Sequence, residues 1–171
     1  MATSIFETDR LIGRHVERAD AEAMHAVYGD PEVVRFVGDG QPLNAETCKR
    51  WIEVIFKKYA QWGYGMTALV QKTDGAIVGF CGLVHPDDQV ETEVKYALRR
   101  DSWGRGFATE AVSAMLTYGT TEFSIDYIIA TVNPSNRRSQ RVLDKAGMNR
   151  CALRQNADGT STQLYTWRKI W

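Results

Sequence analysis

The hydrophobic and polar positions in the first half of the chain predict a strand, two helices and a hairpin. Residues 10–16 alternate in the manner of a strand, and residues 20–29 carry apolar side chains at helical spacing. A second helix is predicted over residues 44–62, starting at the capping candidate Asn44. Two strand-like runs then flank Asp74-Gly75, a dipeptide typical of a tight hairpin turn. The second helix presents large side chains at steps of three or four: Trp51, Ile55, Tyr59 and Trp62.

The second half of the chain predicts strands alternating with helices. Residues 92–100 alternate as a strand, and residues 127–132 form a short apolar run typical of a buried strand. A helix over residues 136–147 is predicted to stop at Gly147. Two strands, at about 148–155 and 162–170, follow it. The helix between the first two strands carries an apolar stripe: Ala108, Ala111, Val112, Met115 and Tyr118. The order β-α-α-β-β-β-α-β-α-β-β predicts an α/β (α+β) fold, a mixed sheet with helices packed against it.

The composition narrows the class of protein. A length of 171 residues suits one domain over residues 1–171. The 21 basic and 21 acidic residues cancel, which argues against a partner that is a nucleic acid or a membrane. Cys48, Cys81 and Cys151 are too scattered for a disulfide framework or a zinc site. No apolar leader core is visible, and no run approaches about 18 apolar residues. We therefore expect a soluble, cytoplasmic protein without a metal ion.

The string WGRGFATEA, residues 103–111, places two glycines directly before a predicted helix. Strand, Gly104-Arg105-Gly106 and helix make a sensible anion site, because first-turn amides and the helix dipole attract phosphate. A P-loop is excluded by the spacing and by the missing lysine. A dinucleotide site lacks its third glycine, since Thr109 stands there, and Asp126 precedes the next strand where the ribose-binding acid should follow it. The pyrophosphate of coenzyme A is the third candidate.

The same string resembles the acyl-CoA loop of the GNAT N-acetyltransferase superfamily, whose pattern is Gln/Arg-x-x-Gly-x-Gly/Ala. It fits from the second position on, with Trp103 in place of Gln/Arg. The nine residues are similar to the ribosomal-protein N-terminal (RimJ/RimL-type) branch, and the resemblance runs from about Thr8 to Trp171. Three further segments carry it: residues 6–36, IVGFCGL and VNPSNRRSQRVLDKAGM. The resemblance implies a GNAT-like, mostly antiparallel central sheet with helices on both faces.

The resemblance also implies direct transfer of acetyl from acetyl-CoA to a primary amine. The backbone of Tyr96, Ala97 and Leu98 is expected to pair with the pantetheine amides. Asn136 and Ser139 share one face of a helix and are expected to approach the pantetheine arm and thiol, with Ser139 protonating the leaving thiolate. The alternative for both residues is hydrogen bonding at the start of the helix. The pyrophosphate is expected on the loop residues Trp103, Gly104, Arg105, Gly106, Phe107, Ala108 and Thr109.

The general base and the acceptor site are less directly encoded. Glu93, on the strand face opposite Tyr96, is the preferred base, the alternative being an exposed strand carboxylate. His85 is a second base candidate, and Glu110 is expected to have a structural role at the start of its helix. Trp62 and Tyr64 are expected at the acceptor site. Three arginines near Asn136 are candidates for the 3′-phosphate of the coenzyme: Arg137, Arg138 and Arg141.

Three functions remain open at this point. The first is acetylation of a protein or peptide N-terminal α-amine, which the branch favours. The second is acetylation of a small molecule such as a polyamine or an antibiotic. The third is an acyl-CoA-binding protein without turnover. A homodimer is suggested by the resemblance alone.

Overall fold

The computed structural model describes residues 2–170, which form one eight-stranded sheet in the order β1-β2-β3-β4-β5-β6-β8-β7. Neighbouring strands are antiparallel except β5 and β6, which are parallel. The strands are β1 (Ser4–Glu7), β2 (Leu11–His15), β3 (Met66–Gln71), β4 (Ile77–Val84), β5 (Thr92–Leu98), β6 (Tyr127–Val132), β7 (Asn149–Gln155) and β8 (Ser161–Arg168). The helices are α1 (Ala21–Tyr28), α2 (Pro31–Val34), α3 (Ala45–Trp62), α4 (Phe107–Phe123) and α5 (Arg137–Lys145).

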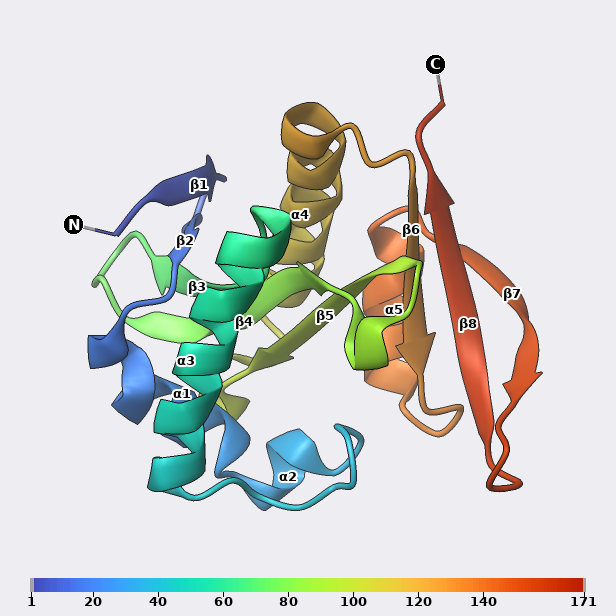
Figure 1. The fold of residues 1–171 in the computed structure, drawn as a ribbon, viewed down its shortest axis with the longest axis horizontal. Helices are drawn as coiled ribbons and strands as arrows, with labels where there is room; N and C mark the ends of the chain where they lie inside the picture. Colours follow the sequence, from blue (N-terminus) through green and yellow to red (C-terminus); the bar gives the residue numbers. More distant parts are fainter. Residues whose placement is uncertain (1, 171) are drawn as a thin grey trace.

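Helices cover both faces of the sheet, as predicted (Figure 1). One core lies under α4 and α5 and includes Leu83, Val94 and Leu143, while the other lies under α1 and α3 and includes Phe80 and Ala97. Adjacent residues of a strand therefore pack into opposite cores, because successive side chains point to opposite faces of the sheet. The order of elements confirms the predicted mixed α/β fold. Among residues 2–170, no helix is long and apolar enough to cross a membrane.

The local signals for α3 and for the β3–β4 hairpin are confirmed. The side chain of Asn44 accepts a hydrogen bond from the backbone N–H of Thr47 at 2.8 Å, and α3 ends at Gly63, which has a φ of 81°. Gly75 in the hairpin has a φ of 71°, a conformation that favours glycine. The buried stripe of α3 differs from the expected one: Cys48, Ile52 and Ile55 are buried, whereas Trp51 and Trp62 are 41% and 37% exposed.

Two elements were not predicted, the edge strand β1 and the one-turn helix α2. Strand β1 has four residues and a bulge between Ser4 and Phe6, so its alternation is too short to be recognised. Its place on the sheet depends on Gly13, because a Cβ atom there would lie 2.4 Å from the Phe6 ring. Helix α2 begins at Pro31 after the capping side chain of Asp30, which accepts from the backbone N–H of Glu32.

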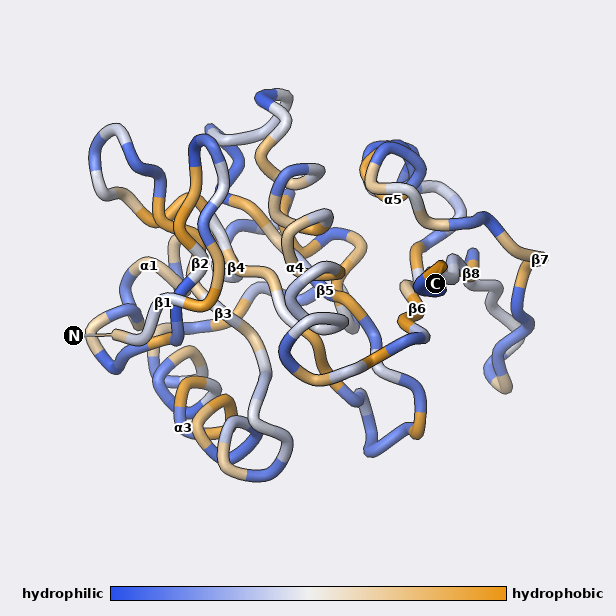
Figure 2. The backbone as a smooth tube through the Cα atoms, turned by 90° about the horizontal axis from the view of Figure 1, so that it is seen from above, coloured by the Kyte–Doolittle hydropathy of each residue, from blue (hydrophilic) through white to orange (hydrophobic). Residues whose placement is uncertain are grey.

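The sheet divides between β5 and β6. These strands are paired only at Thr92–Ile128 and Glu93–Ile129, whereas β5 stays paired with β4 as far as Leu98 and β6 stays paired with β8 over its whole length. Seen from above, β6, β7, β8 and α5 stand to one side of the rest of the molecule (Figure 2). We call the point at Glu93 and Ile129 the fork. Beyond it, no strand formed by residues 2–170 neighbours one edge of β5.

Candidate active site

The two glycines of the WGRGFATEA string form an exposed left-handed turn before α4. Gly104 and Gly106 have φ angles of 73° and 82°, which residues with a side chain rarely adopt. A Cβ atom at Gly106 would lie 3.2 Å from Nη2 of Arg10, whereas a Cβ atom at Gly104 would meet no neighbouring atom within 4 Å, so the space over Gly104 is open. An anion can therefore approach the backbone amides of the turn closely.

Helix α4 begins without a side-chain cap. Asn44 and Asn136 cap α3 and α5 with side-chain oxygens at 2.8 and 3.2 Å from a backbone nitrogen, but Gly106 offers no such oxygen to α4. The amides of the first turn, including those of Phe107, Ala108 and Thr109, thus have no side-chain acceptor at the helix start. Together with the helix dipole they form a site suited to a phosphate group.

Glu110 has the structural role predicted for it. It accepts hydrogen bonds from the Thr8 hydroxyl and from Nε of Arg10, the latter at 2.8 Å. Partial burial raises the pKa of Glu110, but the bonds from Thr8 and Arg10 outweigh it, so the pKa lies below its ordinary value. Arg10 also donates from Nη1 to the Arg105 carbonyl at 2.8 Å. Arg10, in the β1–β2 turn, therefore holds the glycine turn in position through hydrogen bonds to Glu110 and to the Arg105 carbonyl. No feature of the sequence indicated this role.

Trp103 links the glycine turn to β5 and to α5. Its indole nitrogen donates to the Leu98 carbonyl at 2.9 Å, and the Arg138 guanidinium lies over its ring, 4.8 Å from the centroid. Arg105 lies in the same way over the ring of Phe107, at 4.7 Å. Of the three arginines considered for the 3′-phosphate, Arg138 is thus held beside the turn, while Arg137 and Arg141 have no such contact.

The unpaired edge of β5 presents the backbone of alternate residues. Arg99 donates from its backbone nitrogen to the Val78 carbonyl at 2.8 Å, so Arg99 and Val78 are a hydrogen-bonded pair of the β4–β5 ladder. Such pairs alternate along antiparallel strands, which directs the backbone groups of Ala97 toward β4 and those of Tyr96 and Leu98 toward the free edge. The register therefore argues against Ala97 as a backbone partner of a ligand, because it directs the Ala97 groups into the β4–β5 ladder. The Leu98 carbonyl already accepts from Trp103.

Tyr96 and Ser139 meet across the divided sheet. The Tyr96 hydroxyl lies 2.6 Å from Oγ of Ser139, and burial raises the pKa of the phenol. Asn136 has the capping role that the sequence allowed as an alternative, accepting from the Ser139 backbone nitrogen. One end of α5 is thereby held against the free edge of β5.

Glu93 lies at the fork and is 2% exposed, so the alternative of an exposed strand carboxylate is wrong. Its Oε1 accepts from the Thr131 hydroxyl and lies 3.3 Å from Nζ of Lys95. Its Oε2 accepts from the side-chain amide of Gln89 at 3.1 Å. Thr131 and Gln89 were missed in the sequence, although Thr131 is the polar exception in the apolar run YIIATV.

The predicted acceptor residues Trp62 and Tyr64 both contact His85. Trp62 stacks on the His85 ring at a centroid distance of 3.9 Å, and the Tyr64 hydroxyl lies 2.8 Å from Nε2. Nδ1 of His85 lies 3.0 Å from the Gln89 carbonyl, which can only accept, so Nδ1 carries the proton and Nε2 accepts from Tyr64. Both ring nitrogens are engaged, which disfavours His85 as a direct base.

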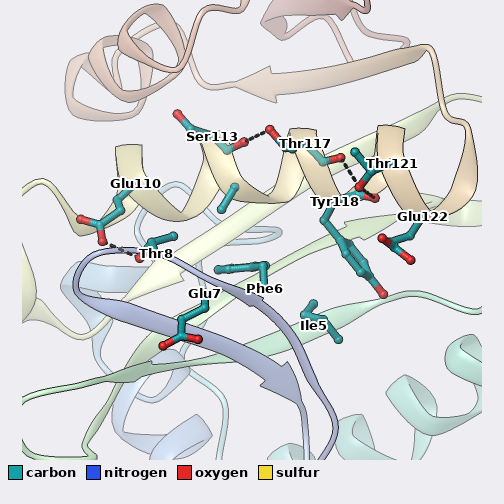
Figure 3. A pocket seen from close by; sticks show the side chains of 11 residues that line it. Ile5, Phe6, Glu7, Thr8, Glu110, Ser113, Thr117, Tyr118, Thr121 and Glu122 are labelled. Atoms are coloured by element: carbon teal, nitrogen blue, oxygen red, sulfur yellow. Dashed lines mark hydrogen bonds between the residues drawn. The ribbon is translucent and has the colours of Figure 1, made fainter.

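A groove between β1 and α4 lies apart from these residues (Figure 3). Glu110 is its one lining residue that belongs to the WGRGFATEA string. Two of its hydroxyls, those of Thr117 and Thr121, donate to carbonyls of their own helix at 3.2 and 3.0 Å. The lining of the groove includes neither the free edge of β5 nor Glu93, and we assign the groove no part in the site.

Comparison with known proteins places this geometry in a family. Residues 10–149 match the family model described as acetyltransferase (GNAT) domain. An uncharacterized N-acetyltransferase, YoaA, from Bacillus subtilis is 30% identical, and the alignment covers 95% of each chain. An uncharacterized N-acetyltransferase, p20, from Bacillus licheniformis is 27% identical, with 92% of this chain and 89% of p20 covered.

Solved structures share the fold. A GNAT-family acetyltransferase from Bacillus anthracis superposes with a TM-score of 0.82 at 23% identity, covering 98% of both chains. RimL, a ribosomal L7/L12 α-N-protein acetyltransferase solved with coenzyme A, gives 0.81 at 14% identity over 97% of this chain and 98% of its own. The microcin C7 self-immunity acetyltransferase MccE, solved with acetyl-CoA and AMP, gives 0.80 at 14% identity over 95% and 94%.

Proposed function

The chain belongs to the GNAT acetyltransferase family, and we propose that it transfers acetyl from acetyl-CoA directly to the N-terminal α-amine of a protein or peptide. It is an N-acetyltransferase by its family, and the peptide acceptor is the part that we propose. The unpaired edge of β5, leading into an uncapped glycine turn, is the observation that supports the binding of acetyl-CoA, and the likeness to RimL supports the α-amine acceptor. RimL, which acts on a protein α-amine, shares the fold. We further propose that residues 1–171 act as one domain in the cytoplasm, where thiols such as Cys48 and Cys81 stay reduced.

Two parts of acetyl-CoA, its pyrophosphate and its pantetheine arm, match the glycine turn and the free edge of β5. Its pyrophosphate is a dianion that matches the amides from Gly104 to Thr109, with Arg138 close by. Its pantetheine arm carries amides, which match the backbone groups of Tyr96 and the backbone N–H of Leu98 as an added strand matches a sheet edge. The arm then runs along β5 from the glycine turn toward the fork, which brings the thioester near Glu93 and Ser139.

The chemistry needs groups that stabilise developing charge and move protons. The amine nitrogen attacks the thioester carbonyl, and a backbone amide on the free edge of β5 stabilises the oxygen that becomes negative. Collapse of the tetrahedral species breaks the carbon–sulfur bond. Ser139, held beside Tyr96, gives its proton to the thiolate as the bond breaks and regains a proton from solvent.

Glu93 is the proposed general base. A free α-amine with a pKa near 8 is neutral in roughly a tenth of molecules at pH 7, whereas a lysine amine near 10.4 is neutral in roughly one in 2,500. An α-amine therefore needs the least help from a single carboxylate. Glu93 removes the proton as the new carbon–nitrogen bond forms, directly or through a water molecule.

The acceptor is proposed to enter beside Trp62 and Tyr64, next to His85. A small-molecule acceptor is the main alternative, because MccE shares the fold equally well. An acyl-CoA-binding protein without turnover is the other.

The proposal is tested with a panel of α-amine peptides, lysine peptides blocked at the N-terminus, polyamines and aminoglycosides, each incubated with acetyl-CoA and analysed by mass spectrometry. We expect a mass increase of one acetyl group on the free N-terminus of a peptide. Acetylation of polyamines or aminoglycosides alone would show that the acceptor is a small molecule and would overturn the proposed peptide acceptor. Binding of acetyl-CoA without acetylation of any amine would favour the non-catalytic alternative.

A further inference from the structure

The carboxylate of Glu93 is held by two hydrogen-bond donors and one ion pair. Thr131 of β6 and Lys95 of β5 both contact Oε1, and Gln89, in the loop between β4 and β5, donates to Oε2. An ionised carboxylate offers about four lone-pair sites. Hydrogen bonds fill one site on each oxygen, and the Lys95 ammonium lies 3.3 Å from Oε1, so the free lone pair that is remote from this cation is on Oε2.

Thr131 reaches the carboxylate from beyond the fork. Glu93 is paired with Ile129, the last parallel pair, and Thr131 lies two residues further along β6, where that strand has left β5. Its side-chain hydroxyl still donates to Oε1 of Glu93. The Thr131–Glu93 bond therefore ties the carboxylate to the strand on the other side of the divided sheet.

Gln89 is itself fixed by its loop. The side-chain nitrogen of Gln89 donates to the Glu91 carbonyl as well as to Glu93, both at 3.1 Å, which uses both of its hydrogens. Its backbone carbonyl accepts from Nδ1 of His85 at 3.0 Å. The loop also contains Asp87 and Asp88 at left-handed φ angles of 50° and 56°, a costly conformation in two consecutive residues that persists only where contacts hold it.

We propose that Thr131 and Gln89 are positioning residues for the general base, and that the free lone pair on Oε2 of Glu93 is the one that takes the proton of the attacking amine. The inference rests on the proposed function. As the amine nitrogen bonds to the thioester carbon, its proton moves to Oε2 and the carbonyl electron pair moves to the oxygen. The protonated carboxyl later returns this proton to solvent. Lys95 is the charged side chain found in contact with Glu93 among residues 2–170.

The test compares Thr131→Val, which keeps the shape and removes the hydroxyl, with Thr131→Ser, which restores a hydroxyl. Loss of a donor weakens the stabilisation of the Glu93 anion, so the acid limb of kcat/KM should move to higher pH. We expect kcat to fall about tenfold in Thr131→Val, with an unchanged KM for acetyl-CoA and substantial recovery in Thr131→Ser. Gln89→Leu should shift the acid limb in the same direction. Thr162→Val, at a β8 threonine whose hydroxyl accepts from Asn156, is the matched control and should change neither quantity.

Glu93→Gln separates this inference from the proposed function. If Glu93→Gln loses activity but Thr131→Val and Gln89→Leu keep both kcat and the wild-type acid limb, the positioning role is wrong and the base remains. A change in melting temperature alone would also reduce Thr131 to a structural role. If Glu93→Gln keeps full activity on the best acceptor, the base assignment fails and the inference fails with it.

Discussion

The Tyr96 hydroxyl lies 2.6 Å from Oγ of Ser139, and this contact spans the two diverging halves of the sheet. Because burial raises the pKa of Tyr96, its proton is not readily given up at neutral pH. The phenol is therefore suited to orient the serine hydroxyl rather than to supply the proton itself. We therefore propose Ser139, and not Tyr96, as the proton donor to the thiolate.

Replacement of Ser139 by alanine should lower kcat only about two- to tenfold, because a thiolate whose conjugate acid has a pKa of about 8.5 leaves readily near neutral pH. Tyr96→Phe should have a smaller effect, and the double variant should match Ser139→Ala, since Tyr96 acts through the serine. Release of free thiol, followed in initial-rate assays, measures all three. Additive losses in the double variant would show that Tyr96 has a separate role.

Gly106→Val should abolish binding of acetyl-CoA, because a side chain there covers the amides that the pyrophosphate needs and is strained at a φ of 82°. The control is Gly75→Val in the β3–β4 turn, which has a similar φ of 71° and open space around a Cβ atom. Both variants carry a comparable backbone strain, so calorimetric titration with acetyl-CoA isolates the effect on the ligand. Normal affinity in Gly106→Val would remove the pyrophosphate from this turn.

Glu110→Gln should destabilise the protein by about 1–2 kcal/mol at pH 7, since it weakens the bonds from Thr8 and Arg10 to a charged acceptor. The pKa of Glu110 is lower in the folded chain than its ordinary value of 4.5. This stabilisation is therefore complete above that value and is lost as the pH falls through the folded pKa. Urea unfolding of both proteins should thus give different free energies at pH 7 and converging ones toward pH 3. An equal difference at both pH values would contradict an electrostatic origin, and Glu122→Gln on the same helix is the control.

Local periodicity was enough to predict most of the sheet and its helices, but not the features that depend on register or on distant segments. Trp51 and Trp62 share helical spacing with Ile55, yet the phase of α3 against the sheet buries Ile52 in their place. The direction of the Ala97 backbone follows from the β4–β5 register, which no local pattern contains. Glu93 is buried through a contact with Thr131, which lies 38 residues further along the chain. A contact of that kind becomes visible only when the sheet is assembled.

Arg138→Ala should raise the KM for acetyl-CoA about fivefold while leaving kcat nearly unchanged, because Arg138 lies over Trp103 beside the glycine turn, where the pyrophosphate is proposed to bind. The effect should shrink at high salt, as expected for a partly exposed charge pair. Steady-state kinetics at two ionic strengths measure it. Arg137→Ala, on the same helix and exposed, should match the wild type, and an equal loss in both variants would indicate a general effect of charge.

Trp62→Ala should raise the KM for the peptide acceptor without changing the KM for acetyl-CoA. Trp62 stacks on His85 at 3.9 Å and is 37% exposed, so one part of the indole is fixed while another can contact a ligand. Loss of an aromatic contact of this size should cost about five- to tenfold in acceptor KM. Trp51, on the same helix and 41% exposed, contacts Tyr28 instead of His85, which makes Trp51→Ala a control for the loss of an exposed indole from α3. A higher acceptor KM in Trp62→Ala alone would support entry of the acceptor beside His85, whereas equal values for both variants would exclude Trp62 from the acceptor site.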